Sequence, residues 1–187
     1  MSIVNPTCPT GCNSQINPIT QDPCTPFVSI GELNRLYIMA AGGAILTTWG
    51  TAGLAAELLG RIDNTASTVD SIVEIIMSGD VPAAAGDMIE IADNKKYYLP
   101  KTFTINFQID DVNQTVHDFL RYMECNQVVK LWYANPDFIW GGNDGIEVNM
   151  QMNDVVERGS KGRYSIQGVI TWEAKFTPER TDNPFAS

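Results

Sequence analysis

The feature that most constrains the fold is a strict alternation of apolar and polar residues that opens the stretch from Lys101 to Arg180. Over residues 101–109 the positions between the apolar ones are filled by Thr, Asn and Gln. The apolar positions are Phe103, Ile105, Phe107 and Ile109. A period of two residues is typical of a β-strand with one buried face, because successive side chains point to opposite sides. The pattern therefore predicts a strand with these four side chains in the core.

A helical pattern follows this strand directly. Between Asp111 and Glu124, apolar residues recur at spacings of three and four, which places them on one face of an α-helix. These residues are Val112, Val116, Phe119, Leu120 and Met123. Asp110 or Asp111 is placed to cap the first turn, because a carboxylate oxygen can accept hydrogen bonds from the free amides there.

Strand patterns resume after the helix. Alternating, β-branched or aromatic segments separated by turn residues occur at Val128–Tyr133, Phe138–Trp140, Ile146–Val156 and Tyr164–Phe176. The triplet Asn143-Asp144-Gly145 tolerates positive φ and predicts a hairpin turn. The order of strand, helix and several strands predicts a mainly β (α+β) fold. We expect an antiparallel β-sandwich or barrel with one principal flanking α-helix and extended terminal arms.

The segment before residue 101 carries weaker signals. The patterns predict strands at Ser29–Met39, Ala44–Trp49 and Met88–Ile91, a helix at Leu54–Leu59, and turns at Gly42-Gly43, Ser78–Pro82, Ala85–Asp87 and Asp93–Lys96. Residues 67–77 form an apolar run that fits a helix or a buried strand equally well, so both remain open there.

Composition divides the chain into one domain and two extensions. With 187 residues, 44% of them hydrophobic, a single domain can bury about 70% of its unfolded surface. Residues 1–27 are rich in proline and cysteine and predict an N-terminal arm; residues 28–180 predict one β-rich domain, and residues 181–187 a C-terminal tail. The first residues have neither a basic nor an apolar leader segment, so synthesis in the cytoplasm is expected.

The charge balance is acidic. Twelve Lys and Arg stand against 22 Asp and Glu, a net charge of −10. Without a basic footprint the chain is not expected to bind nucleic acid through phosphate contacts, although an acidic wall lets a polyanion pass without sticking. The uncharged stretch Leu36–Ala56 has the length of a membrane span, but its glycines and threonines interrupt any apolar block, so no span is predicted.

Catalytic and metal-binding patterns are weak. His117 lies on the predicted helix without a nucleophile motif, so we interpret it as a surface or half-buried residue. Cys8, Cys12 and Cys24 do not form the two close pairs of a zinc site. Whether these thiols and Cys125 are reduced or bridged stays open. We therefore expect no enzymatic activity, no metal and no cofactor.

Aromatic residues near the segment Trp140–Gly145 suggest an alternative function. This segment is similar to one copy of a calcium-binding nonapeptide, which works only in stacked repeats, so we interpret it as a turn. Trp132 and Trp140 could present rings for stacking with a sugar. A carbohydrate-binding β-sandwich is therefore the alternative, although aromatic residues on strands more often belong to the core.

Several short strings stand in order along the chain: Gly31–Ile38, Lys101–Thr104, Phe119–Arg121, Lys130–Tyr133, Ile170–Lys175 and Pro178–Arg180. From about Ser29 to Pro184, these strings and the order of elements resemble tailed-bacteriophage tail tube proteins and the related ring proteins that join head to tail. The resemblance implies a β-sandwich or barrel with a flanking helix, assembled into rings of six or twelve copies.

The resemblance also implies a function: a non-enzymatic virion structural protein, made in the host cytoplasm, in a tail tube or head-tail connector. Its partners would be copies of itself, neighbouring virion proteins, and DNA passing through without specific binding. The uncharged segment 40–53 is the expected contact with a neighbour, because an apolar loop is stable only when covered. The candidate interface residues are Ile45, Leu46, Trp49 and, in the C-terminal tail, Phe185.

Overall fold

The alternating segment forms strand β6 (Lys101–Ile109), and its four apolar side chains are all buried, as predicted. The computed structural model describes residues 31–62, 68–86, 88–91, 95–110, 113–125, 128–156 and 164–186. The predicted N-terminal arm, with its three cysteines, lies outside the described residues.

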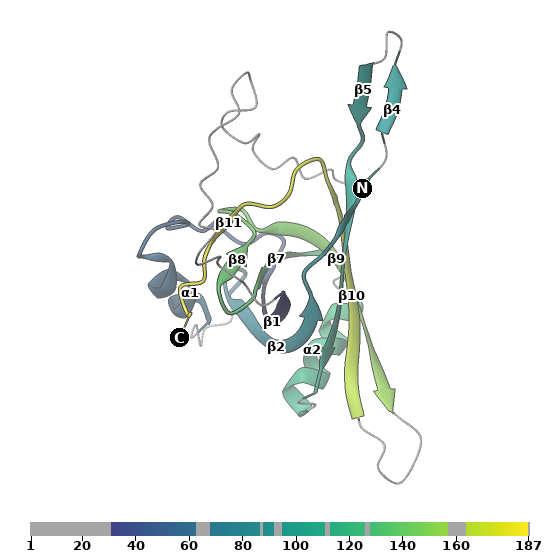
Figure 1. Ribbon diagram of the computed structural model, residues 1–187. Coiled ribbons are helices and arrows are strands. Elements are labelled where there is room, and N and C mark those ends of the chain that lie inside the picture. Colours follow the sequence, from purple (N-terminus) through teal and green to yellow (C-terminus); the bar gives the residue numbers. More distant parts are fainter. Residues whose placement is uncertain are drawn as a thin grey trace, which may run out of the picture.

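Figure 1 shows how the helices and strands are arranged in space. The helices are α1 (Leu54–Ile62) and α2 (Gln114–Cys125). The remaining strands are β1 (Glu32–Ala40), β2 (Ile72–Asp80), β3 (Ala84–Ala85), β4 (Met88–Ile91), β5 (Lys95–Tyr98), β7 (Val128–Ala134), β8 (Phe138–Trp140), β9 (Ile146–Val156), β10 (Tyr164–Ala174) and β11 (Arg180–Asp182).

Six strands close into an antiparallel barrel in the order β1-β2-β6-β10-β9-β7, and pairing of β7 with β1 completes the circle. β8 pairs with β7, β11 pairs with β8, and β3 pairs with β6. The contact between β2 and β6 consists of two residue pairs, Ser78 with Gln108 and Gly79 with Phe107. The predicted mainly β fold, with an antiparallel barrel and a flanking helix, is confirmed.

Two hydrophobic clusters lie on opposite faces of β1 and β7. Leu36 and Leu131 belong to the cluster inside the barrel. Tyr37 and Trp132 belong to an outer cluster that includes Leu58 of α1. Because both faces of β1 and β7 are covered, these strands read as nearly continuous apolar runs instead of alternating.

Helix α2 packs against β9, and Leu120 and Met123 reach the inner cluster. The cap of α2 is Asn113, whose Oδ1 accepts a hydrogen bond from the backbone N–H of Val116 at 3.0 Å. The prediction that Asp110 or Asp111 caps the helix is therefore wrong. Asp110 instead accepts a hydrogen bond from the side-chain amide of Gln108 at 2.7 Å, and Asp111 lies outside the described residues.

Several local predictions differ from the structure. Residues 44–49 are a loop instead of a strand, and Ser78–Asp80 continue β2 instead of turning. Of the open segment 67–77, residues 72–77 form the first part of β2. The turn at residues 143–145 joins β8 to β9, but both strands pair with β7 and not with each other, so no hairpin forms there.

The C-terminal tail packs onto its own chain. β11 pairs with β8 across the predicted boundary at residue 180. Asn183 is buried, and its Nδ2 donates a hydrogen bond to the backbone carbonyl of Asn135 at 2.7 Å. Phe185 packs partly buried against the outer cluster, with its ring centroid 6.3 Å from that of Tyr37. Residues 181–186 are therefore part of the folded body and do not extend from it as an arm.

Candidate assembly surface

The predicted interface residues come together at the outer cluster of their own chain. Leu46 is a buried member of that cluster, and Trp49 and Phe185 pack against it half-buried. Ile45 alone of the four has an exposed side chain. The sequence predicts that a neighbouring subunit covers the apolar loop 40–53. In the structure, Leu46 and, in part, Trp49 are instead covered by other residues of the same chain.

Glu57 on α1 binds this loop at several points. Its carboxylate accepts hydrogen bonds from the backbone N–H groups of Thr47 and Thr48, at 3.0 and 2.9 Å, and from the Thr48 hydroxyl at 2.6 Å. Arg61 donates a further bond at 2.8 Å. Burial alone would raise the pKa of Glu57, but these bonds from Thr48, Thr47 and Arg61 prevail and lower it from 4.5 to about 2.

Two side chains bind three carbonyl groups of the loop. Arg61 donates hydrogen bonds to the carbonyls of Ala44 and Ile45, each at 2.7 Å, and Lys130 Nζ donates to the carbonyl of Gly43 at 2.8 Å. Because a loop whose backbone groups already have partners needs no second chain to satisfy them, the loop is fixed in the single subunit.

The segment Trp140–Gly145 encloses the indole of Trp132. Trp132 Nε1 donates a hydrogen bond to the carbonyl of Gly142 at 2.7 Å. A Cβ atom at Gly141 would stand 2.3 Å from the indole, and one at Gly145 would stand 2.8 Å from it. The glycines are required because only a backbone without side chains can approach the ring so closely.

Neither tryptophan offers an exposed ring to a sugar. Trp132 has no exposed surface, and Trp140 is buried and stacks on Tyr133 with ring centroids 5.2 Å apart. The two indoles lie in different clusters, on opposite sides of the sheet. The interpretation of these residues as core residues is the one that the structure supports.

The β4–β5 hairpin is the feature that sequence reasoning missed. β4 pairs with β5 over four residue pairs, and the ribbon projects well beyond the barrel (Figure 1). The side chains of Met88, Ile89 and Tyr97 are 53%, 49% and 52% exposed. The sequence predicts a turn at Asp93–Lys96, but Lys95 and Lys96 belong to β5. Asp93-Asn94 between two short apolar runs is the sequence signal for a hairpin.

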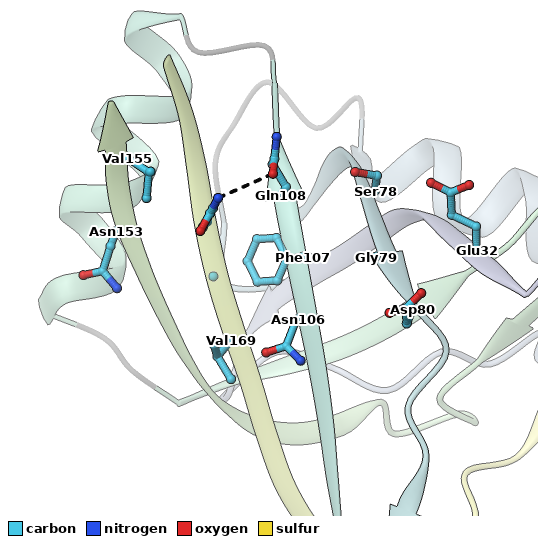
Figure 2. A pocket seen from close by; sticks show the side chains of 12 residues that line it. Glu32, Ser78, Gly79, Asp80, Asn106, Phe107, Gln108, Asn153, Val155 and Val169 are labelled. Atoms are coloured by element: carbon cyan, nitrogen blue, oxygen red, sulfur yellow. Dashed lines mark hydrogen bonds between the residues drawn. The ribbon is translucent and has the colours of Figure 1, made fainter. Parts of the chain in front are cut away.

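A shallow hollow of about 600 Å³ lies on the outer face of β2, β6, β10 and β9 (Figure 2). A row of neutral polar residues crosses all four strands in register: Ser78, Gln108, Gln167 and Asn153. Glu32 and Asp80 lie at the β2 side, and Val155 and Val169 line the β9–β10 side (Figure 2).

The residues considered for catalysis do not form a catalytic arrangement in the described ranges. His117 is half-exposed, and its Nε2 lies 3.9 Å from the carboxylate of Asp154. Cys125 is an exposed free thiol at the end of α2. No three His, Cys, Asp or Glu side chains of the described residues converge to hold a metal ion. Neither of the two described helices is long and apolar enough to cross a membrane.

Comparisons with protein-family models, with curated proteins and with solved structures found no match for this chain.

Proposed function

We propose that the chain is a non-enzymatic virion structural protein that self-assembles into rings, as part of a phage tail tube or head-tail connector. The observation that carries the proposal is the projecting β4–β5 hairpin. It combines three half-exposed apolar side chains with strand edges that pair with nothing else among the described residues.

A two-stranded hairpin is marginally stable in water by itself. The barrel does not need this one, because the clusters that hold the barrel together contain none of Met88, Ile89 or Tyr97. Exposed apolar side chains and open strand edges of this kind are covered in assemblies by a neighbouring chain. A further copy of the same chain is the simplest such neighbour.

The closed barrel and the acidic net charge of the chain are also compatible with assembly into a ring. A closed barrel is a rigid unit with few open edges, so contacts concentrate on what projects from it. A heterologous contact between copies closes into a ring when its rotation divides the circle. The resemblance to phage tail proteins implies six or twelve copies. The net charge of −10 would let DNA pass along the lumen without sticking.

The experiment compares the masses of full-length chains by native mass spectrometry, with negative-stain images. We expect discrete rings for the wild type and monomers for the double variant Ile89→Asp, Tyr97→Asp, because two charges prevent the hairpin from being covered. Val69→Asp, which changes an exposed apolar side chain in the turn before β2, is the matched control and should form rings. Unchanged rings in the hairpin variant would remove the hairpin from the interface.

A further inference from the structure

The hollow on the outer face of the sheet has the dimensions of the hairpin. Across its four strands, about 4.8 Å apart, the hollow spans about 14 Å. A strand of four residues, as in β4 and β5, is about 13 Å long, so the length of the hairpin matches the width of the hollow. On the inward face beneath the hollow, Phe107 is the cross-strand partner of two glycines, Gly79 and Gly168. The Phe107 ring lies where a Cβ of Gly168 would stand, 2.2 Å away.

The polar side chains of the hollow can bind a strand. Gln167 Nε2 donates a hydrogen bond to Gln108 Oε1 at 3.5 Å (Figure 2), and Gln108 Nε2 donates to Asp110 at 2.7 Å. Amide and hydroxyl groups, as in Gln167, Asn153 and Ser78, both donate and accept hydrogen bonds, so they suit backbone and side-chain groups alike. Val169 supplies an apolar contact, since its side chain is 40% exposed between Asn106 and Gln151.

The rim of the hollow carries an unfavourable pair of charges. Glu32 on β1 and Asp80 on β2 are direct cross-strand partners, and both are exposed. Like charges directly opposite each other destabilise an antiparallel pair. A cationic side chain from another molecule would relieve this repulsion. β5 carries two consecutive lysines, Lys95 and Lys96, while β4 carries the acidic Glu90.

A chain cannot fill its own hollow with its own hairpin. The hairpin joins the barrel at Lys101, whereas the hollow lies at Asn106 to Gln108, roughly 20 Å further along β6. The ribbon leads away from the barrel in the opposite direction (Figure 1). The occupant must therefore come from a second molecule.

We infer that the β4–β5 hairpin of a second copy docks in this hollow, with its β5 strand beside Glu32 and Asp80 and its β4 strand over the amide row. The inference rests on the proposed self-assembly and names the surface that receives the hairpin. Donor and acceptor are different surfaces of one chain, so each copy donates to the next and receives from the previous one. Such a head-to-tail contact generates a ring or an open helix.

The first experiment is disulfide cross-linking between two populations of the full-length chain, each with its four natural cysteines replaced by serine. One population carries Tyr97→Cys on the hairpin, and the other carries Val169→Cys in the hollow. We expect covalent dimers in the mixture and few in either population alone. Leu59→Cys replaces Val169→Cys in the control mixture, which should give few dimers. Leu59 is exposed on α1, a helix that does not line the hollow.

The second experiment exchanges charges in the natural sequence. Chains with Glu32→Lys and Asp80→Lys, and chains with Lys95→Glu and Lys96→Glu, should each assemble about tenfold more weakly than wild type. Mixing the two variants should restore assembly, because each hairpin then meets a hollow of opposite charge. Rings in the mixture should contain the two variants in equal numbers.

The outcomes separate the two proposals. If the wild type forms rings but the hairpin cysteine does not react at Val169, and the charge variants do not rescue one another, the hollow is not the acceptor and the ring function stands. If the wild type stays a monomer at all concentrations, both proposals fail.

Discussion

At the scale of single residues, Glu57 holds the loop between β1 and α1 in place. Its partners Thr47, Thr48 and Arg61 bind the carboxylate form, which is why its pKa falls to about 2 although burial acts in the opposite direction. Because the pKa of Glu57 is lower in the folded state, its bonds stabilise the fold fully above pH 4.5, the ordinary pKa of a glutamate. This stabilisation is lost as the pH falls from there towards 2.

We expect Glu57→Gln to lower the free energy of unfolding at pH 7 by about 1–3 kcal/mol, because the amide loses the charge-assisted bonds. Urea titrations between pH 7 and pH 3 measure the effect, and the gap to wild type should narrow below pH 4.5. Glu173→Gln, exposed on β10, is the matched control. A gap that stays constant with pH would contradict the role given to the carboxylate.

Gly145 carries two separate constraints, its backbone conformation and its contact with Trp132. Its φ is +70°, and a Cβ would lie 2.8 Å from the indole. Gly145→Ala should therefore lower the free energy of unfolding by about 2–4 kcal/mol, the sum of backbone strain and overpacking. Thermal or urea unfolding checks the value.

Gly142→Ala separates these two contributions. Gly142 has a φ of +71°, but the nearest atom to its Cβ would be 3.4 Å away, at the end of the Glu179 side chain. The free energy of unfolding of this variant should fall by only about 1–2 kcal/mol, the cost of the strained backbone conformation. Equal losses in the two variants would mean that contact with Trp132 is not what fixes Gly145.

At the scale of elements, the C-terminal segment contributes to the stability of the single chain. Phe185→Ala should lower the free energy of unfolding by about 1–3 kcal/mol, because the ring is partly buried against Tyr37. Ala186→Ser, at an exposed position, is the control. The loss should not depend on protein concentration. A loss that appears only where chains associate would show that Phe185 packs on a neighbour.

Strands and helices with a clear period were predictable from sequence. β8 and β9 begin and end at the predicted residues, and β6 has its predicted buried face. The loop 44–49 was mistaken for a strand because its apolar residues have no turn signal between them. Glu57, ten residues beyond Thr47, accepts hydrogen bonds from the backbone N–H groups of Thr47 and Thr48. These groups are therefore not available for pairing with another strand.

At the scale of the whole molecule, closure of the barrel depends on contacts that no local pattern contains. β1 pairs with β7, although about ninety residues separate them in the chain. The hollow takes its lining from five strands, so no single segment of the sequence signals it. The candidate interface residues are apolar, a property that also fits burial in a single chain. Leu46 is a core residue, and Trp49 and Phe185 pack half-buried against the same cluster.

In the function that we propose, the barrel supports the projecting hairpin, and the hairpin joins one copy to the next. The hydrophobic clusters, the Trp132 enclosure and the Glu57 bonds make the subunit rigid on its own. In the proposed function, assembly uses surfaces that the single chain leaves exposed, which are the hairpin and the outer face of the long strands.

The most direct measurement is the native mass of the full-length chain across protein concentrations from about 1 to 100 μM, a range that detects the micromolar affinities of weak protein contacts. The account predicts one discrete oligomer, visible as rings in electron micrographs and lost in the Ile89→Asp, Tyr97→Asp variant while the melting temperature of the barrel is kept. A chain that remains a folded monomer throughout that range would contradict it.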